Sequence, residues 1–237
     1  MGAFADSALE YYLKQWLLSS KSEPRMLKLC MFLQPLTRLY HRYAYENYLD
    51  LETMEAVINK LIFVSPNRGF LYVTDTTMGR PSHYFEHLSC FFPGLIALGL
   101  RSIDEVYMDK DTRQLHQWAA DGLAHTCWLI YADSKTGLGA DEINVLHVHG
   151  ARNDEGLWVK KLAKWKENGA EGVPPGLSMP EPVHSAKATA TGLVKVEGDQ
   201  KDYTYKRGSY LLRPEALESF YVMWKTSGDE IWRERSW

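Results

Sequence analysis

Apolar positions recur with a helical period near the start of this 237-residue chain. Within residues 6–20, Leu9, Leu13, Trp16 and Leu17 follow the i, i+4, i+7, i+8 spacing. Side chains at this spacing share one face of an α-helix, with polar side chains on the other face. We therefore expect an amphipathic helix here, packed against a core through its leucine and tryptophan side chains.

The same period predicts helices elsewhere along the chain. We expect them over residues 52–63, 81–99, 112–132 and 214–226, with another beginning near Glu230. The segment 81–99 is expected to form a largely buried helix, with an interruption at the Pro93-Gly94 pair. Residues 65–76 start with turn residues and continue into a short β-like run. This succession of helices predicts an all-α fold with long loops and a few short strands.

Two segments depart from the helical pattern. Residues 166–207 hold many of the prolines and glycines and have no apolar period, so we interpret them as a long loop excursion. Residues 25–48 are crowded with large apolar and aromatic side chains around Pro35. They fit either a buried helix pair or an insertion. The chain as a whole, residues 1–237, is expected to belong to one domain.

Composition narrows the class of protein. Hydrophobic residues make up 45% of the chain and aromatic residues 13%, which is enough for a packed core. The net charge is −3 and the basic residues are scattered, so we expect no nucleic-acid partner. No apolar run in the sequence is long enough to span a membrane. The cysteines Cys30, Cys90 and Cys127 lack a CxxC spacing, and the residues alone permit either one bridge or buried free thiols.

Carboxylates gather at two predicted helix starts. Asp6 and Glu10 begin the first helix, and Glu215 and Glu218 follow Pro214 in a later one. The helix dipole alone favours an acid in a first turn by roughly 0.3–1 kcal/mol. Capping and dipole effects therefore explain these residues without any chemistry. The alternative is that they supply the acid and the base of one catalytic site.

The later helix, residues 214–226, shows two faces. Leu217, Phe220, Tyr221 and Trp224 lie together at 100° per residue, and we expect this face to pack against the core. Both acids should then point away from the packed side chains.

Residues 83–87 read His-Tyr-Phe-Glu-His and match the H-x-x-E-H pattern of inverted zinc peptidases. On a helix, His83 and His87 would share a face and could hold zinc, with Glu86 as general base. The pattern is short and arises often by chance, so a zinc peptidase is a remote alternative.

Four stretches together, in this order, resemble the class I α-1,2-mannosidase family (glycoside hydrolase family forty-seven). They are GAFADSALEYYLKQWL (2–17), GRPSHYFEHLSCFFPGLIALG (79–99), CWLIYADSKTGLGADEI (127–143) and YLLRPEALESFYVMWKTSGDEIWRERSW (210–237). The resemblance implies an (α/α)7 barrel of alternating inner and outer helices, of which this chain would be an incomplete central portion. It implies that terminal α-1,2-linked mannose is hydrolysed from N-glycans with inversion and with calcium as cofactor.

The resemblance also assigns roles to residues. It implies that Asp6 and Glu215 are catalytic, with Glu215 as the general base. It implies substrate-binding positions for Glu10, Glu86, His87, Glu142, Arg213 and Glu218. Glu142 falls on the glutamate of a TGL-x-PEI-type loop, although a residue is added here and the usual proline is absent. A disulfide between Cys90 and Cys127 is implied as well.

Other implied features concern the whole enzyme. The family's general-acid glutamate would precede Met1, and its calcium-binding threonine would follow Trp237. We therefore expect no calcium ligand in this chain and no activity from the chain alone. High-mannose N-glycans are the expected partner, the protein is expected to be a monomer, and the endoplasmic reticulum or Golgi lumen is the expected location. The full-length protein could carry an N-terminal anchor. The alternative function is recognition of mannose glycans without turnover, in glycoprotein quality control.

Overall fold

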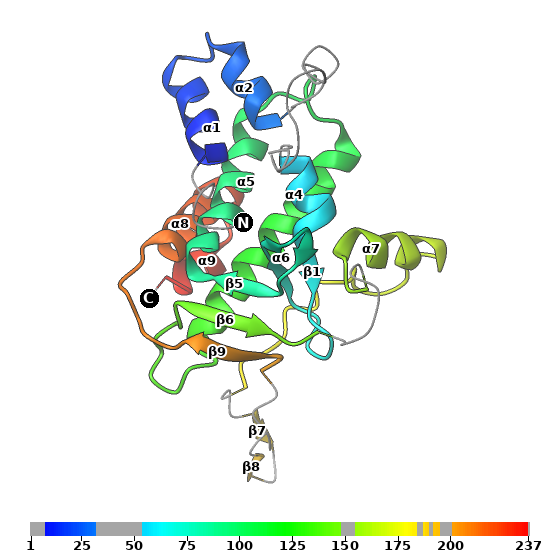
Figure 1. The fold of residues 1–237 in the computed structure, drawn as a ribbon, viewed down its shortest axis with the longest axis vertical. Helices are drawn as coiled ribbons and strands as arrows, with labels where there is room; N and C mark the ends of the chain where they lie inside the picture. The colour runs from blue at the N-terminus through cyan, green and yellow to red at the C-terminus, as the bar shows by residue number, and fades with distance from the viewer. Residues whose placement is uncertain are drawn as a thin grey trace.

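The computed structural model describes residues 8–31, 54–147, 155–183, 187–189, 192–194 and 201–236. Within these ranges helices pack around a centre, and short strands lie along one side of it (Figure 1). The helices are α1 (Ala8–Leu18), α2 (Pro24–Met31), α4 (Met54–Leu61), α5 (Phe91–Ser102), α6 (Lys110–Ala132), α7 (Trp158–Glu167), α8 (Glu215–Ser227) and α9 (Glu230–Glu234), with a 3-10 turn η1 at His87–Cys90. The strands are β1 (Ile62–Val64), β2 (Leu71–Val73), β3 (Thr76–Thr77), β4 (Arg80–Pro81), β5 (Tyr84–Glu86), β6 (Glu142–Val145), β7 (Lys187–Thr189), β8 (Gly192–Val194) and β9 (Tyr203–Arg207).

The close packing of α5 against α8 forms the middle of the core. Gly94 on α5 faces Ser219 on α8, and its backbone N–H donates to the serine Oγ at 2.9 Å. A Cβ atom added at Gly94 would lie 2.8 Å from the Cα of Ser219, which is closer than a side chain can approach a backbone atom. The two helices therefore meet backbone to backbone, which fixes the start of α8 over η1.

A three-stranded antiparallel sheet, in the order β5-β6-β9, lies beside these helices. Phe85 on β5 pairs with Ile143 on β6, and both side chains are buried. One position further along, Glu86 pairs with Glu142, which in turn pairs with Arg207 of β9. Because neighbouring residues of a strand point to opposite faces, the apolar pair enters the core while the charged side chains line the other face.

Most helices predicted from the apolar period are confirmed. They are α1 within 6–20, α4 within 52–63, α6 over 112–132, α8 over 214–226 and α9 beginning at Glu230. Residues 71–73 form β2, as the β-like run predicts, and they pair with β1. The described ranges contain no helix that is both long enough and apolar enough to cross a membrane.

The helix predicted over 81–99 is wrong in its first half. Residues 84–86 form β5, the next four form η1, and the helix starts only at Phe91. It then runs through Pro93 and Gly94 without a break. A proline in the first turn does not interrupt a helix, because its missing N–H would have no intrahelical acceptor there. An apolar run cannot by itself distinguish a buried strand from a buried helix.

The expected packed face of α8 is also wrong in part. Leu217 is 50% exposed and Tyr221 57% exposed, whereas Ala216 and Ser219 are buried with Phe220. Because α8 approaches α5 closely, only small side chains fit on the face of α8 at this contact. The helix is therefore rotated from the orientation that side-chain size predicts, and this rotation turns Glu215 inward.

The two irregular segments are described only in part. Within 166–207, residues 187–189 pair with 192–194, and the last five residues form β9. Of the segment 25–48, α2 extends to Met31, and residues 32–48 lie outside the described ranges. The interpretation of that segment as an insertion is untested.

Candidate active site

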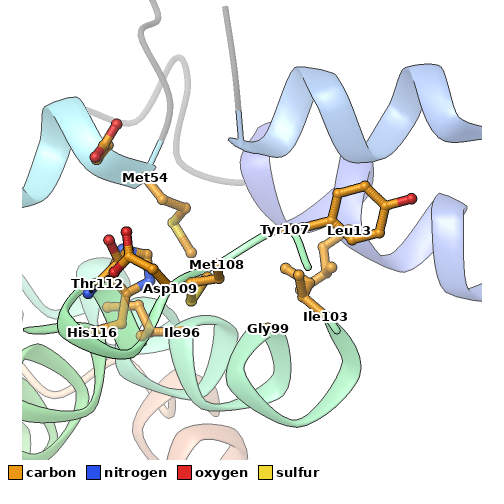
Figure 2. A pocket seen from close by; sticks show the side chains of 11 residues that line it. Leu13, Met54, Ile96, Gly99, Ile103, Tyr107, Met108, Asp109, Thr112 and His116 are labelled. Atoms are coloured by element: carbon orange, nitrogen blue, oxygen red, sulfur yellow. Dashed lines mark hydrogen bonds between the residues drawn. The ribbon is translucent and has the colours of Figure 1, made fainter. Parts of the chain in front are cut away.

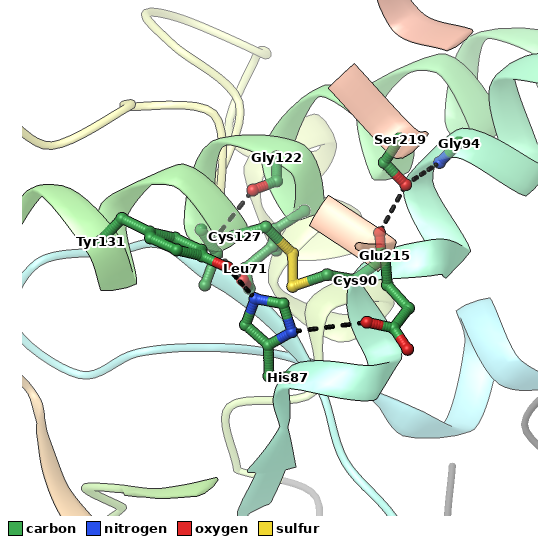
Figure 3. Close-up of a disulfide and its surroundings, with 10 residues drawn as sticks. Leu71, His87, Cys90, Gly94, Gly122, Cys127, Tyr131, Glu215 and Ser219 are labelled. Carbon is green, nitrogen blue, oxygen red and sulfur yellow. Dashed lines mark hydrogen bonds and ion pairs between the residues drawn. A yellow bond between two sulfur atoms is a disulfide. The ribbon is translucent and has the colours of Figure 1, made fainter. Parts of the chain in front are cut away.

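A disulfide anchors the turn that carries the first site residues. Cys90 at the end of η1 is bonded to Cys127 of α6, with 5.8 Å between their Cα atoms, which confirms the predicted pair (Figure 3). Ser219 of α8 donates its hydroxyl hydrogen to the carbonyl oxygen of Cys90. The turn is thus bonded to α6 and to α8 at Cys90, and these two bonds restrain the turn that begins at His87.

His87 and Glu215 face each other across this turn (Figure 3). The imidazole Nδ1 lies 3.8 Å from the carboxylate Oε2, and the imidazole Nε2 lies 2.6 Å from the hydroxyl oxygen of Tyr131. The side chain of His87 is 3% exposed and that of Glu215 is 19% exposed, although the Oε2 that faces the imidazole is itself buried. The glutamate therefore stays within reach of water, while the histidine is enclosed.

The histidine is neutral at physiological pH. Burial, together with the positive charge of Arg213, lowers its pKa from 6.5 to about 4. Burial raises the pKa of Tyr131 to about 12, so the phenol keeps its proton. With a carboxylate opposite Nδ1, the favoured tautomer carries its proton on Nδ1 and accepts the tyrosine hydrogen at Nε2. His87 then presents an N–H dipole, not a charge, to Glu215.

A second group of charges lies at the end of the sheet. Glu86 and Glu142 are cross-strand partners, and Arg207 lies 3.4 Å from the Glu142 carboxylate through its Nη1. Burial raises the pKa of Glu86, and the negative charges of Asp75 and Glu142 raise it further. This end of the sheet is therefore an acidic cluster partly balanced by arginine.

Asp141 is a site residue that sequence reasoning missed. Its carboxylate Oδ1 accepts a hydrogen bond from the Nε of Arg213 at 2.5 Å, and its Oδ2 lies 3.4 Å from the Nη1 of Arg207. Its backbone oxygen accepts the N–H of His87 at 2.8 Å. In the sequence, the one indication of this role is an acid beside Glu142 in the stretch ADEI. The family that the chain resembles has a proline in this loop.

A lysine joins the starts of α1 and α8. Lys14 bonds to Glu10 one turn before it, as its i, i+4 spacing predicts, and its Nζ lies 3.0 Å from the Oε1 of Glu218. Glu215 stands one turn before Glu218 on the same helix. The carboxylates at the two helix starts therefore belong to adjacent parts of the molecule.

The structure brings together seven of the eight residues predicted for catalysis and substrate binding. These are Glu10, Glu86, His87, Glu142, Arg213, Glu215 and Glu218, joined by the contacts above. The eighth, Asp6, lies outside the described residues. The roles of all eight remain predictions.

The zinc interpretation fails on local geometry. His83 has a φ of +56° and precedes a strand, so it does not share a helix face with His87. It hydrogen-bonds through Nδ1 to the hydroxyl of Tyr72 at 2.7 Å, and its ring stacks on that of His147 at 4.1 Å. In the part of the chain that the structure describes, no group of three or more His, Cys, Asp or Glu residues could hold a metal ion. The described residues therefore do not fit a calcium or a zinc site.

A hollow lies between α1, α4, the end of α5 and the start of α6 (Figure 2). Its lining is mainly apolar, and it includes Leu13, Ile96 and Met108. None of the residues predicted for catalysis or substrate binding lines it. The hollow is therefore not part of the candidate site.

The arrangement suits acid–base work on a polar substrate. It offers a partly exposed carboxylate held beside a neutral imidazole, further carboxylates, and a guanidinium. Such groups hydrogen-bond sugar hydroxyls, and a carboxylate in reach of water can act as a general base.

Comparisons with known proteins agree with the resemblance. The model of the family described as "Glycosyl hydrolase family 47" matches residues 1–237. The mannosyl-oligosaccharide alpha-1,2-mannosidase IA of Drosophila melanogaster is 25% identical over 237 residues, covering 100% of this chain and 24% of that protein. The human mannosyl-oligosaccharide 1,2-alpha-mannosidase IC is 26% identical over 237 residues, again 100% of this chain and 26% of that protein. The chain thus spans about a quarter of the length of these relatives.

Two further comparisons add detail. The human endoplasmic reticulum mannosyl-oligosaccharide 1,2-alpha-mannosidase is 26% identical over 237 residues, or 24% of that protein. A solved structure of an alpha-1,2-mannosidase from Trichoderma reesei covers 76% of this chain and 29% of that chain, with 17% identity and a TM-score of 0.48. That structural likeness is too distant to carry a conclusion.

Proposed function

Because this chain belongs to glycosyl hydrolase family 47, we propose that it hydrolyses terminal α-1,2-linked mannose from N-glycans with inversion, with Glu215 as general base. The observation that carries the proposal is the Glu215 carboxylate, which lies 3.8 Å from the Nδ1 of a buried imidazole on a side chain that is 19% exposed. A water molecule on its open side would lose a proton to the carboxylate as it attacks the anomeric carbon. His87 orients the carboxylate without adding a positive charge.

Inversion needs a second carboxyl group that protonates the leaving oxygen. The two groups stand about 6.5–9.5 Å apart in inverting glycosidases, which leaves room for the attacking water. Asp6 is proposed as a further catalytic carboxylate, distinct from that general acid, because it falls on the aspartate of the ADS motif in the resembling stretch 2–17, four residues before Glu10. The bridge from Glu10 through Lys14 to Glu218 supports this proposal, since it brings the start of α1 beside the start of α8.

Substrate binding is proposed for the remaining polar residues. Glu10, Glu86, Glu142 and Glu218 supply acceptors for sugar hydroxyl groups, and Arg213 supplies donors. Calcium, when bound, would orient vicinal sugar hydroxyls and the water. Since the described residues offer no set of ligands for it, we derive no step through calcium.

The remaining proposals concern the protein's setting. The Cys90–Cys127 disulfide supports an oxidising compartment, and one relative is named for the endoplasmic reticulum. We propose the lumen of the secretory pathway as the location, the endoplasmic reticulum or Golgi included. We also propose high-mannose N-glycans as the partner, a monomeric state, and membership of residues 1–237 in one (α/α)7-barrel domain.

The function is tested by measuring glycan binding and mannose release together. Binding of α-1,2-mannobiose and of a Man9 glycan is measured by calorimetry, and released mannose by chromatography, with calcium present. We expect Glu215→Gln to keep binding, because glutamine has the same shape, and to abolish any release. Glu105→Gln changes an exposed glutamate that takes part in none of these contacts and is the matched control.

The outcomes separate the possibilities. Failure of the wild-type protein to bind either mannoside, or release of mannose by the Glu215→Gln variant, would refute the proposal. Binding without release by the wild type is the result expected of the chain alone, and it equally fits glycan recognition without turnover. Release by the purified 237-residue chain would show that the expectation of an inactive chain is wrong, while the proposed function stands.

A further inference from the structure

The carboxylate of Asp141 is enclosed beside the candidate active site, and its side chain is 2% exposed. A buried carboxylate is costly unless charged or hydrogen-bonding groups compensate it. Here both oxygens face arginine, Oδ1 at 2.5 Å from the Nε of Arg213 and Oδ2 at 3.4 Å from the Nη1 of Arg207. The approach to Arg213 is the shorter of the two, and Arg213 is the more enclosed arginine.

The bond to Nε leaves the rest of the Arg213 guanidinium available. A guanidinium is planar and carries five N–H donors in a fixed fork. Holding Nε fixes the plane of this fork. Among the residues that the structure describes, no protein acceptor bonds the terminal nitrogens Nη1 and Nη2 of Arg213. The side chain is 26% exposed, so a ligand can reach those donors.

The backbone of Asp141 hydrogen-bonds to two segments that carry residues of the candidate site. Its carbonyl oxygen accepts the N–H of His87 at 2.8 Å, and its own N–H donates to the carbonyl oxygen of Ser209 at 3.1 Å. One residue therefore positions the start of η1 and the segment leading to Arg213. The positive charge of Arg213 also acts on Glu86 and Glu215, since both carboxylates raise its pKa.

We propose that Asp141 is a positioning residue that fixes Arg213 through Nε, so that its terminal N–H groups bind the hydroxyl groups of a mannoside beside Glu215. The ligand part of this inference rests on the proposed function. Asp141 does not touch the sugar; it acts through Arg213. A purely structural ion pair would instead contribute to folding and leave ligand affinity unchanged.

The chain offers a matched control for that distinction. Asp133 is another buried aspartate that accepts from an arginine, with its Oδ2 at 2.5 Å from the Nη1 of Arg68. Its hydrogen bonds go to Arg68, to Tyr203 and to the backbone N–H of Val183, and none of these residues belongs to the candidate site. Asp133→Asn should therefore lower the melting temperature without changing affinity for a mannoside.

The experiment compares wild type, Asp141→Asn, Asp141→Glu and Asp133→Asn in the 237-residue protein. Affinity for α-1,2-mannobiose is measured by calorimetry. The solvent exchange of the Arg213 Nε–H is measured by nitrogen NMR without ligand, its signal assigned by its absence in Arg213→Lys. We expect Asp141→Asn to weaken mannobiose binding by about tenfold and to speed the exchange, because a neutral amide holds the guanidinium less firmly. Asp141→Glu should recover part of the affinity, and Asp133→Asn should match wild type in both readouts.

Each outcome is decisive. Unchanged affinity in Asp141→Asn, or an equal loss in Asp133→Asn, overturns the positioning role. A wild-type protein that binds no mannobiose refutes the proposed function, and the NMR readout then decides whether Asp141 holds Arg213. Should Asp141→Asn not fold, a fast-exchanging Arg213 Nε–H in the wild type overturns the inference, and a slowly exchanging one supports it.

Discussion

The close approach of Gly94 to Ser219 makes a strong prediction, because it fixes where α8 carries Glu215. An alanine Cβ at position 94 would lie 2.7 Å from the Oγ and 2.8 Å from the Cα of Ser219. Non-bonded carbon atoms prefer about 3.5–4.0 Å. The serine side chain could rotate away, but its Cα belongs to the backbone of α8. The helices must therefore separate locally by about 1 Å.

The magnitude follows from three contributions to the free energy of unfolding. Overpacking between the two helices costs about 1–3 kcal/mol. The hydrogen bond from the Gly94 N–H to Ser219 is stretched or lost, at about 1 kcal/mol. The higher helix propensity of alanine returns at most about 1 kcal/mol. We expect Gly94→Ala to destabilise the protein by about 2 kcal/mol, which lowers the melting temperature by about 4–8 °C at this chain length.

The assay is urea denaturation followed by circular dichroism, with thermal melting alongside. Gly208→Ala is the control, because its added Cβ would meet nothing closer than the Cβ of Tyr205 at 3.9 Å. Adding Ser219→Gly to Gly94→Ala should restore only part of the loss, since the added methyl group still meets the backbone of α8. A Gly94→Ala protein as stable as wild type, or more stable, would refute the reasoning about the close helix packing.

Two further predictions concern stability. Burial lowers the pKa of His87, His116 and His125 from 6.5 to about 4 each, so between these pH values the unfolded chain binds more protons than the folded one. The free energy of unfolding should be highest above pH 6.5 and should fall by roughly several kcal/mol as the pH drops toward 4. Urea midpoints that stay level from about pH 7.5 to about pH 5 would contradict this prediction. Reducing the Cys90–Cys127 bridge, which joins residues 37 apart, should cost about 3–4 kcal/mol, and a melting temperature that does not change with reductant would show that the bridge contributes little.

Regular helices were predictable because their signal is local. Over α6 the buried side chains Ala119, Leu123, Cys127 and Ile130 recur every three or four residues, so the period itself locates the helix. The segment before α5 has no such period. There a partly buried strand, a 3-10 turn and a buried helix follow one another, and the letters of the segment do not distinguish them.

The orientation of α8 illustrates a different limit. Large apolar side chains predicted the packed face, yet the close approach of Gly94 places the smaller Ala216 and Ser219 inward. Which helix faces which, and how closely, depends on a glycine more than a hundred residues away in the chain. No local pattern contains that information.

The candidate site shows the same difference between what local sequence predicts and what tertiary packing decides. The chain alone determined which acids stand at helix starts, where the helical periods lie, and which stretches resemble a known family. Tertiary structure decided which groups meet: Glu215 with His87, Lys14 with both helix starts, and Arg213 with Asp141, 72 residues apart. Local periodicity follows from backbone geometry within a few residues, whereas a charge finds its partner only after strands and helices have packed.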